Sequence, residues 1–419
     1  MLIHSASQLL TLAGGTRRGT TGEDLAIIEN GAILLQDDRV IEVGESSALL
    51  EKYPYEEKLD ASGRVVMPGL VDPHTHLVWA GDRAVEFEAR LQGKTYMEIM
   101  AAGGGINSTV NATRQASPEE LYTQTRQRAE AMFRNGTTTT EAKTGYGLAF
   151  DAELAQLEVL LRLDDVGPLE VVPTFMPAHA VPPEFKGRGE DYTRVVTAEM
   201  LPLLKEWWLD HQHDRPLPFV DVFCENNAFD LGQTREILTR AHELGFPLKA
   251  HVDEFENLGG AALAVELGAV SIEHAVKTSA AEITALGASD TVVVSLPCTP
   301  FGLADPQYTP ARDLLAAGGM LAIATDLNPG TAWCENMQFV IALACRYLKI
   351  TPAQAVAAAT INAARAIQRD HLVGSLEPGK QADLLILSVP DYRHLAYRFG
   401  GNLVQSVVKK GRLYKFDQL

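Results

Sequence analysis

Two histidines one residue apart, His74 and His76, follow a short apolar run and Asp72 in the stretch Val-Met-Pro-Gly-Leu-Val-Asp-Pro-His-Thr-His. Alternate residues of an extended strand point to the same side, so both imidazoles can face one point. Two neutral imidazoles that converge at a strand end make half of a zinc or iron site. The alternative is a surface loop that happens to carry two histidines. A metal site therefore requires further ligands elsewhere in the chain.

Several later apolar runs also end in residues that can bind a metal or move a proton. Of eight short apolar runs in the central part of the chain, the third is followed by His179. The fifth is followed by His251 and Glu254. His274 ends the sixth run, and Asp326 follows the eighth. Because these residue types recur at the ends of separate runs, their clustering favours a shared site over unrelated packing or solvent-facing residues.

The ends of these runs supply a set of three imidazoles and one carboxylate. The predicted metal ligands are His74, His76, His251 and Asp326. Such a set leaves room for water or substrate, and a divalent ion held there lowers the pKa of bound water toward neutrality. We predict catalytic roles for Glu254, His274 and Asp326, with Glu254 as a general base or as an acceptor for a substrate N–H.

The central part of the chain alternates short apolar runs with helical patterns. The eight predicted strands are Leu70–Leu77, Thr137–Ala142, Leu169–Phe175, Phe219–Cys224, Pro247–Val252, Val270–His274, Thr291–Leu296 and Leu321–Thr325. Helical patterns between them include residues 118–135, 152–163, 232–244, 258–267, 279–286 and 309–317. This repeat predicts a TIM (β/α)8 barrel, in which chemistry lies at the C-terminal ends of the strands. A doubly wound sheet is the alternative, but the first strand-to-helix connection has no G-x-G-x-x-G.

Both ends of the chain have the texture of β-structure. Ala32–Leu35 and Arg39–Val43 flank a turn near Asp37, and Val404–Val408 and Arg412–Lys415 flank another near Lys410. The two ends are therefore expected to build one small β domain, a β-sandwich, from residues 1–67 and 366–419. The barrel, residues 68–365, would be inserted between them.

Composition excludes several classes of protein. The net charge of -18 and the absence of a Lys/Arg-rich block argue against nucleic-acid binding. No apolar run approaches the ~20 residues that span a bilayer, and we recognise no signal peptide. The four cysteines, which have no C-x-x-C spacing, fit reduced thiols better than a disulfide framework. We therefore expect a cytoplasmic protein with no membrane partner.

The motifs together resemble those of the amidohydrolase superfamily. They are Val-Asp-Pro-His-Thr-His, the later histidine and aspartate strand ends, and the tail Gly-Ser-Leu-Glu-Pro-Gly-Lys-Gln-Ala-Asp-Leu. Within it the chain is similar to the imidazolonepropionase family along nearly its whole length. The stretches that carry this similarity are Trp79–Arg83, Gly93–Tyr96, Gly103–Ile106, Thr140–Gly147, Ala178–Glu184, Ala250–Glu254 and Thr325–Gly330. The stretches are specific jointly, although each would be weak alone.

The resemblance implies that water opens the ring of 4-imidazolone-5-propanoate to give N-formimidoyl-L-glutamate. It implies one metal ion, Zn²⁺ or Fe²⁺/Fe³⁺, on the four ligands named above. Many superfamily members hold two metals bridged by a carboxylated lysine at the end of strand four, but that strand here ends in Cys224 and Glu225. The implied substrate contacts are Arg83, Tyr96, Tyr146, His179, Glu254, Asn328, Gly330 and Thr331. A homodimer is also implied.

The physical needs of that substrate agree with these residues, and two other functions stay open. A flexible propionate calls for a cation, and Arg83 can bind a carboxylate through two parallel hydrogen bonds. One alternative is another amidohydrolase, such as a deaminase of a purine or pyrimidine ring. The other is a catalytically inactive barrel used as a scaffold, which the complete ligand set disfavours.

Overall fold

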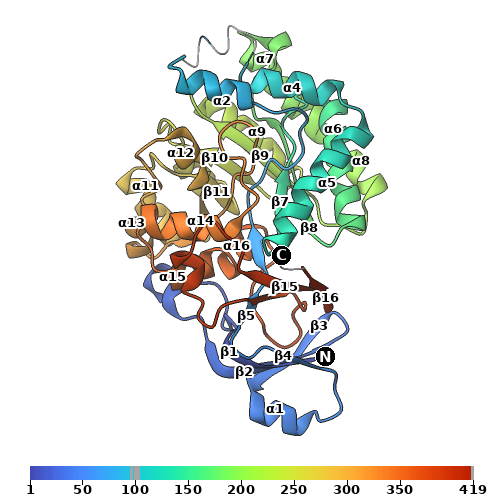
Figure 1. Cartoon of the computed structure of the whole chain (residues 1–419). Coiled ribbons are helices and arrows are strands. Elements are labelled where there is room, and N and C mark those ends of the chain that lie inside the picture. Colours follow the sequence, from blue (N-terminus) through green and yellow to red (C-terminus); the bar gives the residue numbers. More distant parts are fainter. Residues whose placement is uncertain (95–97, 99–103, 417–419) are drawn as a thin grey trace.

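The computed structural model describes residues 1–94, 98 and 104–416. It consists of a barrel with surrounding helices and a separate sheet built from both end segments of the chain. This sheet lies below the barrel in Figure 1. None of the described helices combines the length and apolar character that a bilayer span requires. The four cysteines are free thiols.

Eight parallel strands form the barrel in chain order. They are β6 (Leu70–Asp72), β7 (Thr137–Lys143), β8 (Glu170–Ala178), β9 (Phe219–Cys224), β10 (Lys249–Val252), β11 (Ser271–His274), β12 (Val292–Ser295) and β13 (Met320–Ile323). Each corresponds to one of the eight predicted strands, so the predicted TIM barrel is confirmed and the doubly wound alternative is wrong. The first strand is shorter than predicted, because regular pairing stops at Asp72, before the two histidines.

The barrel closes between its first and last strands through residues just beyond their ends. Thr75 and Leu327 form an isolated parallel bridge. The His76 amide donates to the Leu327 carbonyl at 2.9 Å, and the Asp326 amide donates to the His74 carbonyl at 3.2 Å. Asp72 adds a side-chain link, because it accepts from the Thr325 hydroxyl at 2.6 Å. Predicted metal ligands therefore lie on both sides of the closing seam.

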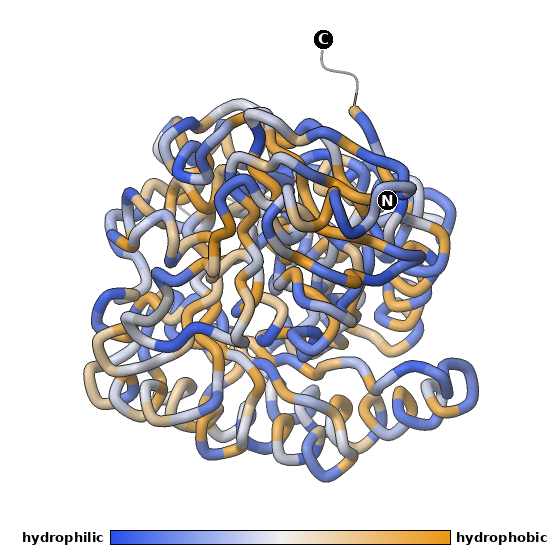
Figure 2. Tube along the Cα trace, turned by 90° about the horizontal axis from the view of Figure 1, so that it is seen from below, coloured by the Kyte–Doolittle hydropathy of each residue, from blue (hydrophilic) through white to orange (hydrophobic). Residues whose placement is uncertain are grey.

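Helices cover the outside of the barrel. The predicted segments correspond to α5 (Pro118–Arg134), α6 (Phe150–Val166), α9 (Leu231–Glu243), α10 (Gly260–Glu266), α11 (Ala280–Ala288) and α13 (Ala311–Ala316). Further helices are α2 (Ala84–Leu91), α4 (Ile106–Gln115), α7 (Gly189–Val195), α8 (Leu201–His211), α12 (Cys298–Leu303), α14 (Met337–Leu343), α15 (Pro352–Ala358), α16 (Ile361–Ala366) and α17 (His394–Tyr397). The outer helices alternate between hydrophobic and hydrophilic residues, as Figure 2 shows, because only one face of each packs inward.

The second sheet, called here the terminal sheet, contains both ends of the chain. Its strands are β1 (Leu2–Leu10), β2 (Ile27–Gln36), β3 (Arg39–Glu45), β4 (Lys58–Asp60), β5 (Val65–Pro68), β14 (Leu384–Leu387), β15 (Val404–Lys409) and β16 (Arg412–Lys415). The chain ends meet where β5 pairs with β14. Helix α1 (Ser46–Lys52) packs against this sheet. The domain boundaries after residues 67 and 365 stay predictions.

Gly69 joins the terminal sheet to the barrel, since it lies between β5 and β6. A Cβ atom at this position would lie 2.2 Å from the Thr138 hydroxyl oxygen on β7, closer than any real contact. Glycine is therefore required here by the close approach of two strands and not by a turn.

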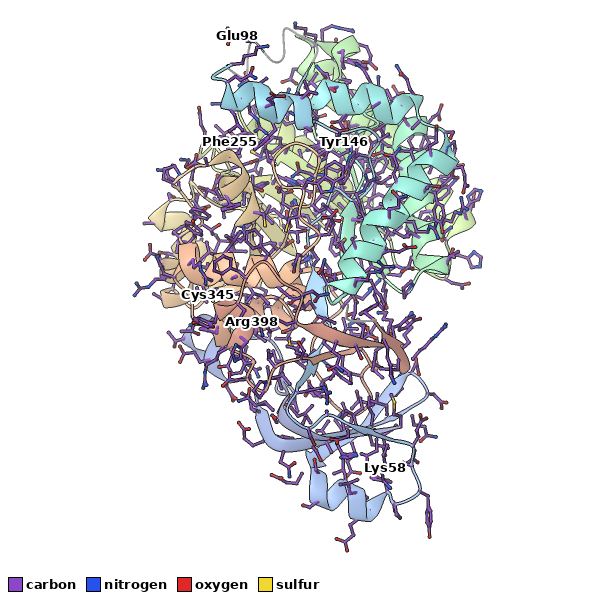
Figure 3. The ribbon with its side chains drawn as sticks, viewed as in Figure 1. Lys58, Glu98, Tyr146, Phe255, Cys345 and Arg398 are labelled. Atoms are coloured by element: carbon purple, nitrogen blue, oxygen red, sulfur yellow. The ribbon has the colours of Figure 1, made fainter. Side chains whose placement is uncertain are left out.

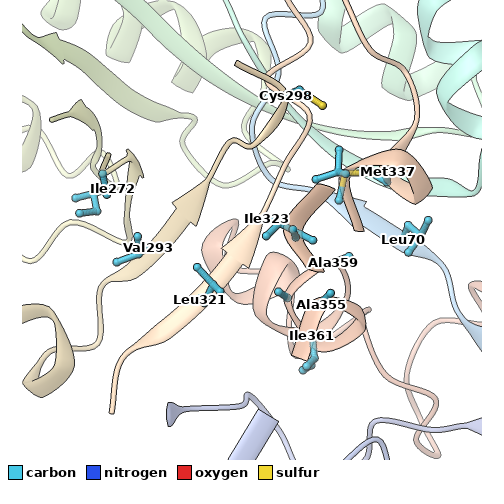
Figure 4. Packing of buried hydrophobic residues seen from close by; sticks show 14 of the residues in the cluster. Leu70, Ile272, Val293, Cys298, Leu321, Ile323, Met337, Ala355, Ala359 and Ile361 are labelled. Carbon is cyan, nitrogen blue, oxygen red and sulfur yellow. The ribbon is translucent and has the colours of Figure 1, made fainter. Parts of the chain in front are cut away.

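The largest hydrophobic core lies between the barrel strands and the helices around them. Figure 4 shows part of it, where Leu321 and Ile323 of β13 lie near Ala355 and Ala359. Small alanine side chains let α15 approach the barrel closely, and α15 and α16 both contact β13. This packing supports the ends of the strands that carry the candidate site.

A buried ion-pair cluster connects the barrel to the terminal sheet. Glu170 of β8 lies 3.1 Å from the Lys409 ammonium of β15, and Lys409 also lies 2.6 Å from Asp383. Burial raises the pKa of Glu170, but Lys409, Gln381 and Lys410 outweigh that effect and lower it to about 2. The charged carboxylate therefore stabilises the contact between the two parts.

Replacing Glu170 with glutamine is expected to lower the free energy of unfolding at pH 7 by about 3 kcal/mol, the equivalent of a pKa drop from 4.5 to about 2. Since the folded-state pKa is depressed, this stabilisation is complete above pH 4.5 and is lost as the pH falls through about 2. Urea unfolding at several pH values measures the difference. Glutamine at the exposed Glu158 is the control, and equal effects of both changes would contradict the role of Glu170.

Candidate active site

The four predicted metal ligands converge at the C-terminal end of the barrel. His74 Nε2 lies 3.3 Å from Asp326 Oδ1, and His76 Nε2 lies 3.7 Å from the same oxygen. The Nε2 atoms of His76 and His251 are 3.3 Å apart. All four side chains are buried, although they come from the first, fifth and eighth strand ends.

This cluster fits a metal ion on three grounds. Edges of 3.3 to 3.7 Å match a tetrahedron with metal–ligand bonds of about 2.0–2.1 Å, whose edge is about 3.3 Å. Burial first, and then the neighbouring histidines and Lys143, hold the pKa of His74 and of His76 well below the usual value, so both rings are neutral ligands. His74 Nε2 has no hydrogen-bond partner among the described residues, so a buried lone pair is left for a cation.

Asp326 is positioned by its neighbours. Its Oδ2 accepts from the Thr299 hydroxyl at 2.5 Å, which leaves Oδ1 directed at the histidines. Burial raises the pKa of Asp326 to about 6, and a bound cation would oppose that rise. The Asp326 backbone is left-handed, with φ of 53°, as is that of His274 at 69°. Such strain costs on the order of 1–3 kcal/mol per residue and is typical of functional sites.

Glu254 and His274 lie together beside the ligand cluster. Glu254 Oε2 is 3.5 Å from His274 Nε2, and the His274 ring centre is 5.8 Å from that of His74. Burial, then the charges of Asp326 and Glu225, raise the pKa of Glu254 well above the usual range. A carboxyl group beside an imidazole and the ligand cluster is placed to act as a general acid or base.

His179 and Tyr146 form one wall of the site. His179 stacks on His76 with ring centres 4.6 Å apart, and its Nδ1 lies 3.0 Å from the Gly145 carbonyl. Figure 3 shows Tyr146 in the part of the barrel remote from the terminal sheet. The loop that carries Tyr146 is held by the buried Glu153, which accepts from the amides of residues 145, 147 and 148.

The loop after β13 forms another wall, together with Arg83. Asn328 Oδ1 accepts from the amides of Gly330 and Thr331, each at 2.8 Å, so this side chain shapes the loop. Gly330 lies directly against Arg83, because a Cβ atom there would lie 2.5 Å from Arg83 Nη1, the flexible end of that side chain. Arg83 Nε pairs with Glu86 at 2.8 Å, and its Nη1 faces the loop. Tyr96 lies outside the described residues.

A buried charge network beneath the ligands was not predicted from the sequence. The Lys143 ammonium lies 2.8 Å from Asp221 and 2.7 Å from Glu141, and all three side chains are fully buried. Asp221 Oδ2 in turn lies 3.1 Å from His251 Nδ1. Burial raises the pKa of Asp221, but Lys143 and then His251 lower it well below the usual value, so this carboxylate is charged.

The fold and the ligand cluster define the class of protein. Residues 65–414, which include the barrel and the ligand cluster, match the model of the amidohydrolase family. The chain therefore belongs to the amidohydrolase family. The family and the ligand cluster together support a divalent metal ion as cofactor.

Curated relatives place the chain more narrowly. It is 49% identical over 418 residues to the imidazolonepropionase of Herpetosiphon aurantiacus, covering 100% of this chain and 98% of the relative. It is 49% identical to that of Chloroflexus aggregans, over 99% and 98% of the two chains, and 44% identical to that of Geobacillus kaustophilus, over 100% and 98%. Within the amidohydrolase family its place is among the imidazolonepropionases.

Solved structures share the fold. A zinc-bound adenosine deaminase from Xanthomonas campestris has a TM-score of 0.69 at 19% identity, covering 98% of this chain and 92% of the other. The guanine deaminase of E. coli has a TM-score of 0.67 at 16% identity, covering 99% and 100%. At these identities the likeness concerns the architecture and not the substrate.

Proposed function

We propose that this protein hydrolyses the cyclic amide C–N bond of 4-imidazolone-5-propanoate to give N-formimidoyl-L-glutamate, with one zinc or iron ion. The observation that carries the proposal is the convergence of three buried imidazoles and Asp326 at the strand ends. The full-length relatives named imidazolonepropionase support the choice of substrate. Cytoplasmic location and a homodimer remain predictions.

The chain's own residues divide the work between binding and proton transfer. His74, His76, His251 and Asp326 would hold the ion, which supplies Lewis acidity and lowers the pKa of a water molecule. Glu254 accepts the proton of the attacking water and returns it to the ring nitrogen that leaves. His274, 3.5 Å from Glu254, stabilises the oxygen that gains negative charge. Asp326 Oδ2 accepts a hydrogen bond from the Thr299 hydroxyl, which fixes the orientation of the Asp326 carboxylate.

The walls of the site orient the substrate. Arg83 binds the propionate, and Tyr146 and His179 contact the ring. The loop that contains Asn328, Gly330 and Thr331 lies on the same side of the site as Arg83. These three residues therefore contact the carboxylate end of the substrate. Tyr96 is proposed to add a hydroxyl donor near that end.

A direct assay tests the proposal. The ultraviolet absorbance of imidazolonepropionate is expected to fall when the metal-loaded protein is added, and the His251→Ala variant is expected to leave it unchanged. Adenine and guanine derivatives serve as competing substrates. Release of ammonia from those rings, without loss of imidazolonepropionate, would favour the deaminase alternative instead.

Replacing Arg83 with glutamine is expected to raise KM by about 10- to 100-fold with a smaller change in kcat, because charge-assisted hydrogen bonds to the carboxylate contribute roughly 1.5–3 kcal/mol. Steady-state kinetics of both proteins measure this. The methyl ester of the substrate is the control, since it lacks the negative charge and should show little difference between the two proteins. An unchanged KM for the acid would count against Arg83 as the propionate site.

A further inference from the structure

Asp221 occupies an unusual place for a carboxylate. It lies inside β9, not at its end, and has no solvent exposure. Its Oδ2 atom lies between two cations or potential cations, 2.8 Å from the Lys143 ammonium and 3.1 Å from His251 Nδ1. Asp221 has no role in the proposed mechanism.

The position of Asp221 Oδ2, 3.1 Å from His251 Nδ1, favours one tautomer of His251. A carboxylate that lies 2.8 Å from an ammonium group offers acceptor oxygens to its other neighbour, so we expect the proton of His251 on the nitrogen beside it, Nδ1. A neutral imidazole has a single N–H, which leaves the lone pair on Nε2. That atom faces the Nε2 of His76 at 3.3 Å, inside the ligand cluster. The opposite tautomer would place two lone pairs against each other at 3.1 Å.

The Lys143 ammonium compensates the negative charge of the buried Asp221 and connects this residue to further buried groups. Its ammonium also pairs with Glu141 at 2.7 Å, and Glu141 accepts from the backbone amide of Thr75 at 3.3 Å. Thr75 is the residue between His74 and His76. One buried ammonium group thus connects the carboxylate behind His251 to the backbone that carries the other two imidazoles.

We propose that Asp221, with Lys143 as its counter-ion, is a positioning residue that orients His251 with Nε2 toward the metal. The inference rests on the ligand set of the proposed function. Carboxylates that accept from the second nitrogen of a ligating histidine fix its ring and raise its basicity, and their loss typically weakens metal binding 10- to 100-fold.

A second metal at this place is the competing explanation. Ligand atoms of Asp221, His251 and Glu273 lie within 4.8 Å of one another, a spacing that a cation could bridge. However, the Lys143 and Lys249 ammonium groups already lie 2.8 Å from Asp221 and 2.9 Å from Glu273. The lysines therefore supply the positive charge, and one ion per chain is expected in the loaded protein. Two tightly bound ions per chain would overturn the role given to Lys143.

The main test measures metal affinity and not hydrolysis. Asp221→Asn is expected to bind zinc about 10- to 100-fold more weakly than the unmodified protein in competition with a chromophoric chelator. Glu273→Gln is the matched control, because Glu273 is equally buried and paired with a lysine, but its hydrogen-bond partners are Lys249 and Ser271 and not a proposed metal ligand. An Asp221→Asn affinity within threefold of the unmodified protein would overturn the proposal, as would an equal loss in both variants.

A second measurement needs no change at Asp221, so a folding failure of the variant does not decide the matter. In the zinc-loaded, nitrogen-15-labelled protein, His251 is expected to carry its proton on Nδ1, with its signal identified by loss in His251→Gln. A proton on Nε2 would contradict the proposal. Neither measurement uses substrate, so a failure to hydrolyse imidazolonepropionate would reject the proposed function while leaving this inference standing.

Discussion

Removal of the divalent metal ion is expected to abolish ring hydrolysis and to lower the thermal midpoint of the protein by about 5 °C. Without the ion, His74 Nε2 is a buried atom with no hydrogen-bond partner among the described residues, and two further Nε2 atoms face each other at 3.3 Å. An ion present at a thousand times its Kd stabilises the folded chain by about 4 kcal/mol. For a chain of 419 residues, the unfolding entropy converts this into about 5 °C.

Chelation followed by gel filtration prepares the metal-free protein, and calorimetry with an activity assay compares it before and after zinc or iron is added back. The His76→Ala variant is the control, because its midpoint should respond little to added metal. Full activity in protein shown by elemental analysis to be free of metal would reject a metal-dependent mechanism.

Glu254→Gln is expected to lower kcat by about 10²- to 10⁴-fold while metal content stays unchanged, the range typical for the loss of a general acid or base. Glutamine keeps the size of the side chain but cannot carry a proton between water and the leaving nitrogen. Glu254 is close to His274 at 3.5 Å and stands outside the four proposed ligands. Its substitution should therefore separate proton transfer from metal binding.

Glu256→Gln provides the comparison, since Glu256 lies two residues away in the same loop and its side chain is exposed. Steady-state kinetics and elemental analysis of both variants distinguish the two effects. If Glu254→Gln kept kcat within threefold, another group would have to move the proton. If it lost its metal, Glu254 would belong to the ligand set.

The sequence was sufficient for the barrel and for the residues at its rim. Short apolar runs between helical patterns identify parallel strands, and polar residues that end those runs must meet at one edge of the barrel. The sequence therefore predicts that His251, His274 and Asp326 lie beside His74 and His76, as they do in the structure. The helices α14, α15 and α16 were not predicted, because they are short and mostly buried, so they lack a polar face with helical period.

The buried network could not be placed from sequence in the same way. Asp221 is the single polar residue of Phe-Val-Asp-Val-Phe-Cys, whose other residues are typical of a buried strand, and the run does not indicate what the side that carries Asp221 faces. In a barrel that side faces the interior, where Lys143 from β7 meets it. The sequence signal for this network was the presence of acidic and basic residues inside strands that are otherwise predicted to be buried. Which charges pair depends on the positions of neighbouring strands, and these positions follow only from the closed barrel.

The seam of the barrel carries one more consequence. Backbone hydrogen bonds from His76 and Asp326 join the first and last strands, and the side chains of the same two residues belong to the ligand cluster. A local opening that parted those strands would also have to pull the ligands away from a shared ion. The ion would then hold the first and last strands together. Part of the free energy of metal binding would stabilise the closed barrel against local opening. The stability of the barrel against local unfolding and the catalytic activity would therefore both increase with metal occupancy.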